Sequence, residues 1–406
     1  MGSGPASLRG RSLAKLVLFT GLTGLSIDLY LPAFPAIAAD LGATPGEVQR
    51  TLSAYLFGVA IGQLFAGPLS DQIGRRPVLM GGLILHVIAS LGCVFANSPD
   101  QLILLRLLQA LGGCVMPVVA RGHIRDQASG HYAARALSTV MAATLIVPLV
   151  APALGGIIVE QAGWRATFAV LALAASISLF VAWRSFPETN ARAGGPVRWR
   201  ELVLMQGFGQ VLRDPVSQRY IGTTMLTSGG LFAYLAASPF VFISWFGVPA
   251  DKFFLVFGAN VLAIAAGAQL NARIVSRYGS RKLFEHGLML QVGAASCLVA
   301  AAWLEPHNMY LYALPLLVFL SGVHLVGTNA SACTLDRFPH ASGTASALAG
   351  TSQFLLGALI TAGVGNIPLP APQGMALVII TCMAAGTTVA WTLRGRAAAA
   401  AAHGEP

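Results

Sequence analysis

Long apolar segments, separated by short polar stretches, run along the whole chain. Each segment is roughly 20 residues long, which is the length of helix that crosses the hydrocarbon core of a bilayer. The pattern predicts twelve transmembrane helices in two sets of six. The first set covers residues 13–38, 48–69, 77–97, 100–121, 136–159 and 164–184, and the second set covers residues 219–241, 252–273, 283–304, 309–332, 342–364 and 373–393.

A polar stretch rich in Pro, Gly and Arg, residues 185–218, separates the two sets. It predicts a cytoplasmic linker, with a short interfacial helix near residues 199–212, between an N-terminal bundle (1–184) and a C-terminal bundle with a cytoplasmic tail (219–406). A weak repeat relates the halves, because "GPLSDQIGRRPVL" follows span two and "ARIVSRYGSRKLF" follows span eight. We therefore expect an all-α membrane protein of two pseudo-symmetric six-helix bundles, with a substrate site at their interface.

The composition and the charge distribution agree with this reading. Of the 406 residues, 55% are hydrophobic and only 10% are charged, whereas soluble domains carry about 25% charged residues. With the N-terminus in the cytoplasm, nearly all Lys and Arg side chains of the loops fall on the cytoplasmic side, and only Arg50, Arg165 and Lys252 fall outside. This bias is the positive-inside pattern. It predicts that both termini are cytoplasmic, and it explains the net charge of +10 without a nucleic-acid partner.

Two ionisable residues lie deep inside predicted spans. Asp28 is the only charged residue between Lys15 and Asp40, so about 18 Å of helix separates it from either end. Keeping an acid there costs at least about 2.5–3.5 kcal/mol. Arg106 in the fourth span lies about 22 Å from Arg121, a depth similar to that of Asp28. We expect the two side chains to share one cavity, in direct contact or through water or Gln109.

This pair predicts proton coupling. Desolvation favours a neutral acid, whereas a nearby arginine favours the carboxylate, so Asp28 is suited to bind and release a proton near neutral pH. The alternative is a static ion pair that only fixes helix packing. Aromatic and polar side chains at similar depth predict a cavity for an amphipathic organic molecule, although ordinary packing is the alternative for each. With Asp28 and Gln109, the candidate substrate-binding residues are Tyr30, Tyr55, Phe232, Tyr234, Asn260 and His324. We interpret His86 as structural.

Two further segments contain residues that we expect to take part in conformational change. The loop "GPLSDQIGRRP" is a tight cytoplasmic turn in which Gly74 suits a left-handed conformation. In this turn we expect Asp71 to meet a helix N-terminus or an arginine of a neighbouring loop. In span five, two prolines interrupt the helix and two glycines allow close helix contact. The loop candidates are Gly67, Asp71, Gly74, Arg75 and Arg76, and the span-five candidates are Pro148, Pro152, Gly155 and Gly156.

Four motifs resemble those of a known family. The string "GPLSDQIGRRP" closely resembles the G-x-L-a-D-r-x-G-r-r loop of the major facilitator superfamily, with Gln72 where a basic residue is usual. "LLRLLQALGG" resembles its fourth-span motif, with Ala110 replacing Gly, and "VPLVAPALGG" resembles the fifth-span antiporter motif, with Ala151 replacing Gly. "IDLYLPAFPAIAADLG" is similar to the first span of proton-coupled drug exporters. Together the motifs resemble the bicyclomycin/chloramphenicol-resistance (Bcr/CflA) subfamily.

The resemblance implies proton-coupled efflux of amphipathic drugs, phenicol-like or bicyclomycin-like, by a monomer in a bacterial inner membrane. In the family the 67–76 loop latches the cytoplasmic gate, and the bend of span five limits leakage. No catalytic constellation, metal cluster or phosphate loop stands out in the sequence, so we expect no enzyme activity, no cofactor and energy from an ion gradient. The expected partners are a small amphipathic organic substrate, protons and the lipid bilayer. Export of a cellular metabolite (a sugar, nucleoside, amino-acid derivative or siderophore) is an alternative, and a non-transporting sensor or scaffold is a more distant one.

Overall fold

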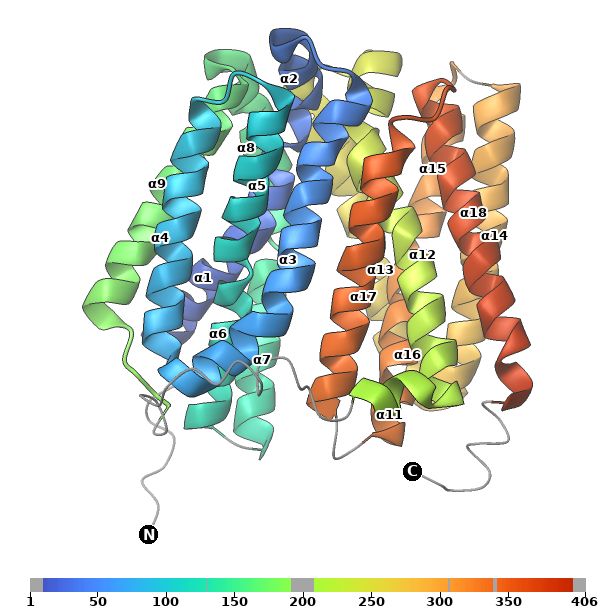
Figure 1. The fold of residues 1–406 in the computed structure, drawn as a ribbon. Helices are drawn as coiled ribbons and strands as arrows, with labels where there is room; N and C mark the ends of the chain where they lie inside the picture. The colour runs from blue at the N-terminus through green and yellow to red at the C-terminus, as the bar shows by residue number, and fades with distance from the viewer. Residues whose placement is uncertain (1–9, 129, 191–207, 306, 339–341, 397–406) are drawn as a thin grey trace. The chain divides into compact units, whose positions relative to one another are not determined.

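The computed structural model describes residues 10–128, 130–190, 208–305, 307–338 and 342–396. Within them, every regular element is helical, and twelve helical segments are long and apolar enough to cross a membrane (Figure 1). The prediction of an all-α protein with twelve spans is confirmed. The segments are Ser12–Leu41, Pro45–Ile73, Arg75–Val94, Pro99–Gln127, Arg135–Ala162, Trp164–Ser185, Pro215–Trp245, Ala250–Tyr278, Ser280–Leu304, Met309–Arg337, Gly343–Val364 and Ala371–Thr392.

The chain divides into two compact units. Unit 1 comprises Met1–Thr44, Arg50–Leu204 and Ala250–Phe254, and unit 2 comprises Pro45–Gln49, Met205–Pro249 and Leu255–Pro406. Most of the predicted interfacial helix falls in residues 191–207, outside the described residues; the part that is described forms α11 (Phe208–Arg213). The predicted bundle boundaries stay a prediction.

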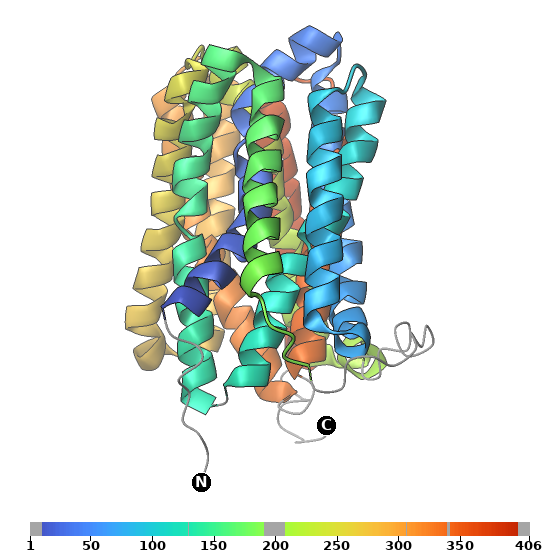
Figure 2. The same ribbon diagram turned by 90° about the vertical axis from the view of Figure 1, so that its left-hand side faces the viewer.

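Unit 1 contains the first six spans, except for Pro45–Gln49 at the start of the second. In it α4 packs against both α5 and α9, and α1 packs against α7 and α8. Figure 2 shows α9, in green, beside the blue α4 on the face turned to the viewer. The helices are α1 (Arg11–Asp28), α2 (Phe34–Leu41), α3 (Pro45–Ile73), α4 (Arg75–Val94), α5 (Pro99–Gly113), α6 (Val115–Gln127), α7 (Gly130–Thr144), α8 (Val147–Ala162) and α9 (Trp164–Ser185).

Prolines break two of these spans, the first and the fifth, and the interruption of the fifth was predicted from the sequence. Pro32 has no N–H to bond the carbonyl of Asp28, so α1 ends there and the chain continues through a 3₁₀ turn, η1 (Leu31–Ala33), into α2. In span five, α7 ends two residues before α8 begins, and Pro148 occupies the first turn of α8, where its missing N–H has no helical partner to lose. The first break places Asp28 at a helix end inside the span.

Unit 2 contains the other six spans, except for Ala250–Phe254 at the start of the eighth. Its α12 packs against α16, α17 and α18, and α14 packs against α15, α16 and α18. The short α11 lies across the ends of α12 and α17 (Figure 1). The elements are α12 (Pro215–Pro239), the π-helical turn η2 (Phe240–Trp245), η3 (Ala250–Lys252, grouped with unit 1), α13 (Phe253–Tyr278), α14 (Ser280–Leu304), α15 (Met309–Ser321), α16 (Val323–Arg337), α17 (Ser342–Val364) and α18 (Ala371–Thr392).

Candidate functional site

Asp28 is the last residue of α1 and is nearly buried, with 6% of its surface exposed. Among the described residues its carboxylate has no hydrogen-bond or ion-pair partner. Although its oxygens have no partner among these residues, they are not completely sealed from solvent. The acid predicted to sit at mid-span therefore retains a narrow opening, and nothing in the described protein neutralises it.

Arg106 on α5 is fully buried, and aromatic rings enclose its guanidinium group. The Cζ atom lies 4.0 Å from the ring centre of Tyr30, 4.2 Å from that of Tyr55 and 5.8 Å from that of Phe168. Nη1 donates to Oε1 of Gln109, whereas Nε and Nη2 have no hydrogen-bond partner. Cation–π attraction, worth up to about 2 kcal/mol where water is excluded, takes the place of a carboxylate.

The structure connects Asp28 to Arg106 through Tyr30 and does not pair the two charges. Tyr30 follows Asp28 by two residues in the turn after α1, and the Tyr30 ring covers the guanidinium of Arg106. The sequence left open whether Asp28 and Arg106 contact each other directly. In the structure these two described residues form no direct ion pair. Gln109 contacts Arg106 and donates to Ser90 Oγ at 2.7 Å, but it does not reach Asp28.

A buried polar chain that the sequence did not reveal joins Gln109 to α1 through His86. The Gln109 backbone carbonyl lies 2.9 Å from His86 Nδ1, so Nδ1 must donate. His86 Nε2 lies 3.2 Å from the Oγ of Ser26, two residues before Asp28. A neutral imidazole therefore accepts from the Ser26 hydroxyl, whereas a protonated one donates to Ser26 and leaves that hydroxyl to bond the carbonyl of Leu22, 2.8 Å away.

The 67–76 loop is largely helical, because α3 runs to Ile73 and α4 begins at Arg75. Gly74, with φ 110°, forms the turn between the two helices, as expected of a glycine at this position. Arg75 pairs with Asp71 at 2.6 Å and with Asp126 of α6 at 3.1 Å. Asp71 was expected to meet a helix N-terminus or an arginine of another loop, but its partner is Arg75 four residues on. Gly67 lies on α3 at ordinary contact distance from α6.

Glu188, which the sequence reading missed, occupies the helix N-terminus instead. Its carboxylate accepts the backbone N–H groups of Arg75 and Arg76, each at 2.9 Å, at the start of α4. Burial raises the pKa of Glu188, but hydrogen bonds from the backbone N–H groups of Asn190, Arg76, Arg75 and Thr189 lower it further, so the pKa lies below its ordinary value. Residues 187–190 thus fasten the end of span six to the 67–76 loop.

The span-five motif brings α8 against the end of α1. Pro152 lies inside α8, and Gly155 and Gly156 are buried. A Cβ atom at Gly155 would collide with the backbone carbonyl of Leu29, the residue after Asp28. One at Gly156 would collide with the backbone of η3. The glycines therefore permit the close helix contact that the sequence predicted, at the turn that carries Asp28.

The remaining candidates lie in unit 2. Asn260 Nδ2 donates to the Tyr234 hydroxyl at 2.9 Å, and the Tyr234 ring stacks on Phe257 at 5.9 Å between centres. Phe232 packs against Phe354. His324 is partly exposed, with Nδ1 3.4 Å from the Thr328 hydroxyl. The structure therefore joins Tyr234 to Asn260.

His324 borders a polar cavity of about 250 Å³ within unit 2. Seven of its eleven lining residues carry a hydroxyl or amide group, and Ser228 donates to Gln353 Oε1 at 3.0 Å across it. Phe232, Tyr234 and Asn260 do not line it. The lining residues are Thr224, Thr227, Ser228, Leu231, Gln291, Val323, His324, Gly327, Thr328, Ser331 and Gln353. Throughout the described ranges, no group of three or more His, Cys, Asp or Glu side chains is placed to hold a metal ion.

Comparison with known proteins gives a consistent family assignment. Residues 16–362 match the Major Facilitator Superfamily. The chain is 29% identical to a bicyclomycin resistance protein homolog of Haemophilus influenzae, covering 95% of this chain and 96% of the relative, and 30% identical to a chloramphenicol resistance protein of Pseudomonas aeruginosa, covering 93% and 90%. Multidrug resistance protein D of Escherichia coli is 28% identical, covering 93% and 94%.

Solved structures show the same fold. A bacterial homolog of the human lysosomal transporter Spinster superposes with a TM-score of 0.74 at 14% identity, covering 98% of each chain. A D-xylose–proton symporter superposes with a TM-score of 0.72 at 17% identity, covering 94% of this chain and 96% of the symporter.

Proposed function

The chain belongs to the Major Facilitator Superfamily, and on that premise we propose that it exports amphipathic drugs in exchange for protons by alternating access. It is a multi-pass membrane transporter and not an enzyme. Relatives named for resistance to bicyclomycin and chloramphenicol support phenicol-like or bicyclomycin-like substrates. The positive-inside pattern supports a bacterial inner membrane location with both termini in the cytoplasm, and the subfamily resemblance supports a monomer.

The observation that carries the proposal is the unpartnered carboxylate of Asp28. A buried ionised group without a partner is costly, and taking up a proton removes that cost. Asp28 binds a proton from the acidic side of the membrane when its cavity opens there. When the transporter opens to the cytoplasm and binds substrate, Asp28 releases that proton into the cytoplasm. The pH gradient therefore powers export.

The neighbouring groups have separate tasks in this scheme. Arg106, fixed by Tyr30, Tyr55 and Gln109, holds the Tyr30 ring and with it the turn that follows Asp28. The cavity of His324 offers hydroxyl and amide partners for the polar groups of a neutral or weakly basic drug. The 67–76 loop, pinned by Glu188, acts as the cytoplasmic gate latch, and the α8 glycines hold the turn of Asp28 in place.

Reconstitution tests the proposal. Purified protein in liposomes with an imposed pH gradient is given labelled chloramphenicol, and uptake is compared with and without the gradient. Asp28→Asn keeps the side-chain shape but cannot exchange a proton, so gradient-driven transport falls to background. Glu160→Gln, at an exposed position near the end of α8, is the matched control and leaves transport unchanged.

Folding and substrate choice need to be distinguished in this test. Asp28→Asn must elute as one species and unfold at the temperature of the parent protein, so that lost transport reports lost coupling. Full gradient-driven transport by Asp28→Asn would overturn the role of the acid. If no drug in a panel of phenicols and bicyclomycin moves, the assigned drug class is wrong.

A second candidate function, export of a cellular metabolite, is favoured by the lining of the His324 cavity. Its many hydroxyl and amide groups match the hydrogen-bonding groups of sugars and nucleosides. The same liposomes distinguish the two functions. A metabolite exporter takes up labelled sugar or nucleoside in exchange for protons, and it takes up none of the phenicols.

A further inference from the structure

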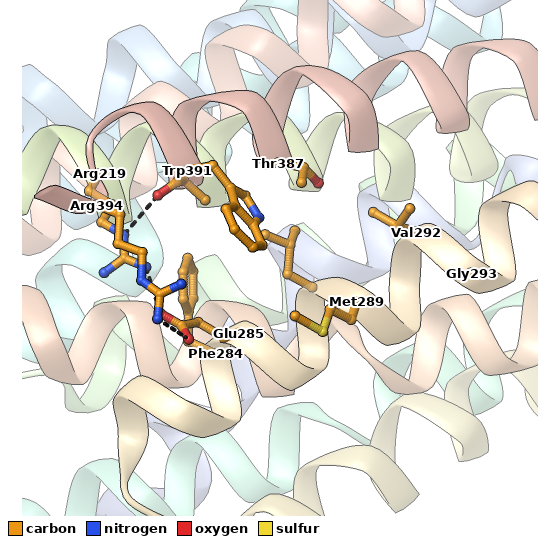
Figure 3. Close-up of a pocket in the computed structure, with 11 residues that line it drawn as sticks. Arg219, Phe284, Glu285, Met289, Val292, Gly293, Thr387, Trp391 and Arg394 are labelled. Carbon is orange, nitrogen blue, oxygen red and sulfur yellow. Dashed lines mark hydrogen bonds and ion pairs between the residues drawn. The ribbon is translucent and has the colours of Figure 1, made fainter.

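Unit 2 contains a second cavity that the transport scheme does not use. It measures about 450 Å³ and lies between α12, α14 and α18, near the end of unit 2 where α12 and α14 begin and α18 finishes (Figure 3). The lining residues are Arg219, Phe284, Glu285, Leu288, Met289, Val292, Gly293, Thr387, Ala390, Trp391 and Arg394.

One end of this cavity is charged. Arg219, with 3% of its side chain exposed, reaches Glu285 Oε1 at 2.9 Å and donates to the Ala390 carbonyl at 3.0 Å. Arg394, with 46% of its side chain exposed, lies 3.5 Å from the other Glu285 oxygen, its only polar partner within the described chain. Two guanidinium groups thus share one carboxylate, which leaves a net positive charge and leaves Arg394 donors free for a ligand.

The other end is apolar and open. Figure 3 shows Trp391, Met289 and Val292 beyond the charged group, one to two helical turns further into α14 and α18. Trp391 and Met289 expose more than half of their surface. A Cβ atom at Gly293 would meet nothing within 4 Å, so the floor at this point is empty space. The charged groups are near the helix ends, and the apolar groups are deeper in the spans.

We propose that this cavity binds an anionic phospholipid, with its phosphate at Arg394 and an acyl chain along Trp391, Met289 and Gly293. The order of charge and apolar surface matches the order of headgroup and tail in a leaflet. Basic pockets between spans on the cytoplasmic side suit anionic headgroups, and a tryptophan at the boundary is typical of the membrane interface. Arg281 and Lys282, which begin α14, add positive charge at the same level. The inference does not depend on which substrate is transported.

Native mass spectrometry of the full-length protein, titrated with phosphatidylglycerol and separately with phosphatidylethanolamine, tests the proposal. The parent protein binds one phosphatidylglycerol in preference to phosphatidylethanolamine. Arg394→Gln weakens phosphatidylglycerol binding about five-fold, the contribution of one basic residue near a membrane surface. Arg396→Gln, also exposed but outside the cavity, leaves binding unchanged.

A filling variant tests the acyl site. Gly293→Leu occupies the empty floor without a backbone clash and abolishes the bound lipid, whereas Gly81→Leu, at an equally open and exposed glycine of α4, does not. Quenching of Trp391 fluorescence by phosphatidylglycerol with brominated acyl chains, taken as the difference from Trp391→Phe, confirms the site. Equal lipid binding by the parent, Arg394→Gln and Gly293→Leu, or equal binding of the two lipids by the parent, overturns the proposal.

Discussion

Replacing Gly155 by alanine tests whether the contact between α8 and the end of α1 is as close as described. The new Cβ atom would meet the backbone carbonyl of Leu29 well inside the 3.0 Å that such contacts keep, so α8 and the turn must separate by about 1 Å. Neither side of the contact is a flexible side chain that can swing away. Overpacking of this kind costs about 1–3 kcal/mol. We therefore expect a lower unfolding temperature, and a lower rate of gradient-driven transport because Asp28 precedes Leu29.

The assay follows the exposure of buried thiols. Cys93 and Cys114 are buried in unit 1, and a thiol-reactive dye reports their exposure on heating. Gly81→Ala is the control, because its Cβ atom meets nothing within 4 Å. At position 81 the gain in helix propensity raises the free energy of unfolding by about 0.5–1 kcal/mol. An unfolding temperature for Gly155→Ala at or above that of the parent would refute the argument, because the helices would then not be in backbone contact.

Two further predictions concern charged groups of unit 1. Arg106→Lys keeps the charge but loses the flat guanidinium between two rings and the fixed bond to Gln109, so the free energy of unfolding falls by about 2 kcal/mol; an unchanged thermal transition would contradict the aromatic enclosure. Glu188→Gln weakens the cap on α4 by about 0.3–1 kcal/mol. Because the pKa of Glu188 is lowered, its contribution is present above the ordinary carboxyl pKa and is lost as pH falls through the lowered value. The difference in unfolding temperature between parent and variant therefore closes on acidification, and a difference that is constant from pH 7 to pH 3.5 would contradict the cap.

The spans were predictable because each requires only a local run of apolar residues, and the bilayer fixes its length. Asp28 and Arg106 were also recognisable from the sequence, because an ionisable residue within such a run is conspicuous. The proline break after Asp28 and the turn at Gly74 are local as well, since each depends on the backbone chemistry of one residue.

The partners of these residues were not predictable, because they come from distant parts of the chain. Arg106 lies between rings that precede it by 76 and 51 residues (Tyr30 and Tyr55), and aromatic residues are too common in spans to reveal which ones stack. Glu188 and Arg75 are 113 residues apart, and Glu188 reads in the sequence as an ordinary linker acid. Serine and threonine recur throughout membrane helices, so the polar wall near His324 becomes visible only when α12, α16 and α17 lie together.

The aromatic enclosure of Arg106 has a consequence for the transport cycle. An arginine neutralised by an acid partner would lose its anchor each time that acid took up a proton, and its helix would loosen with every turnover. Here the rings of Tyr30 and Tyr55 have no charge to lose. In the proton-coupled cycle proposed above, the cation therefore keeps its position whether Asp28 is protonated or ionised.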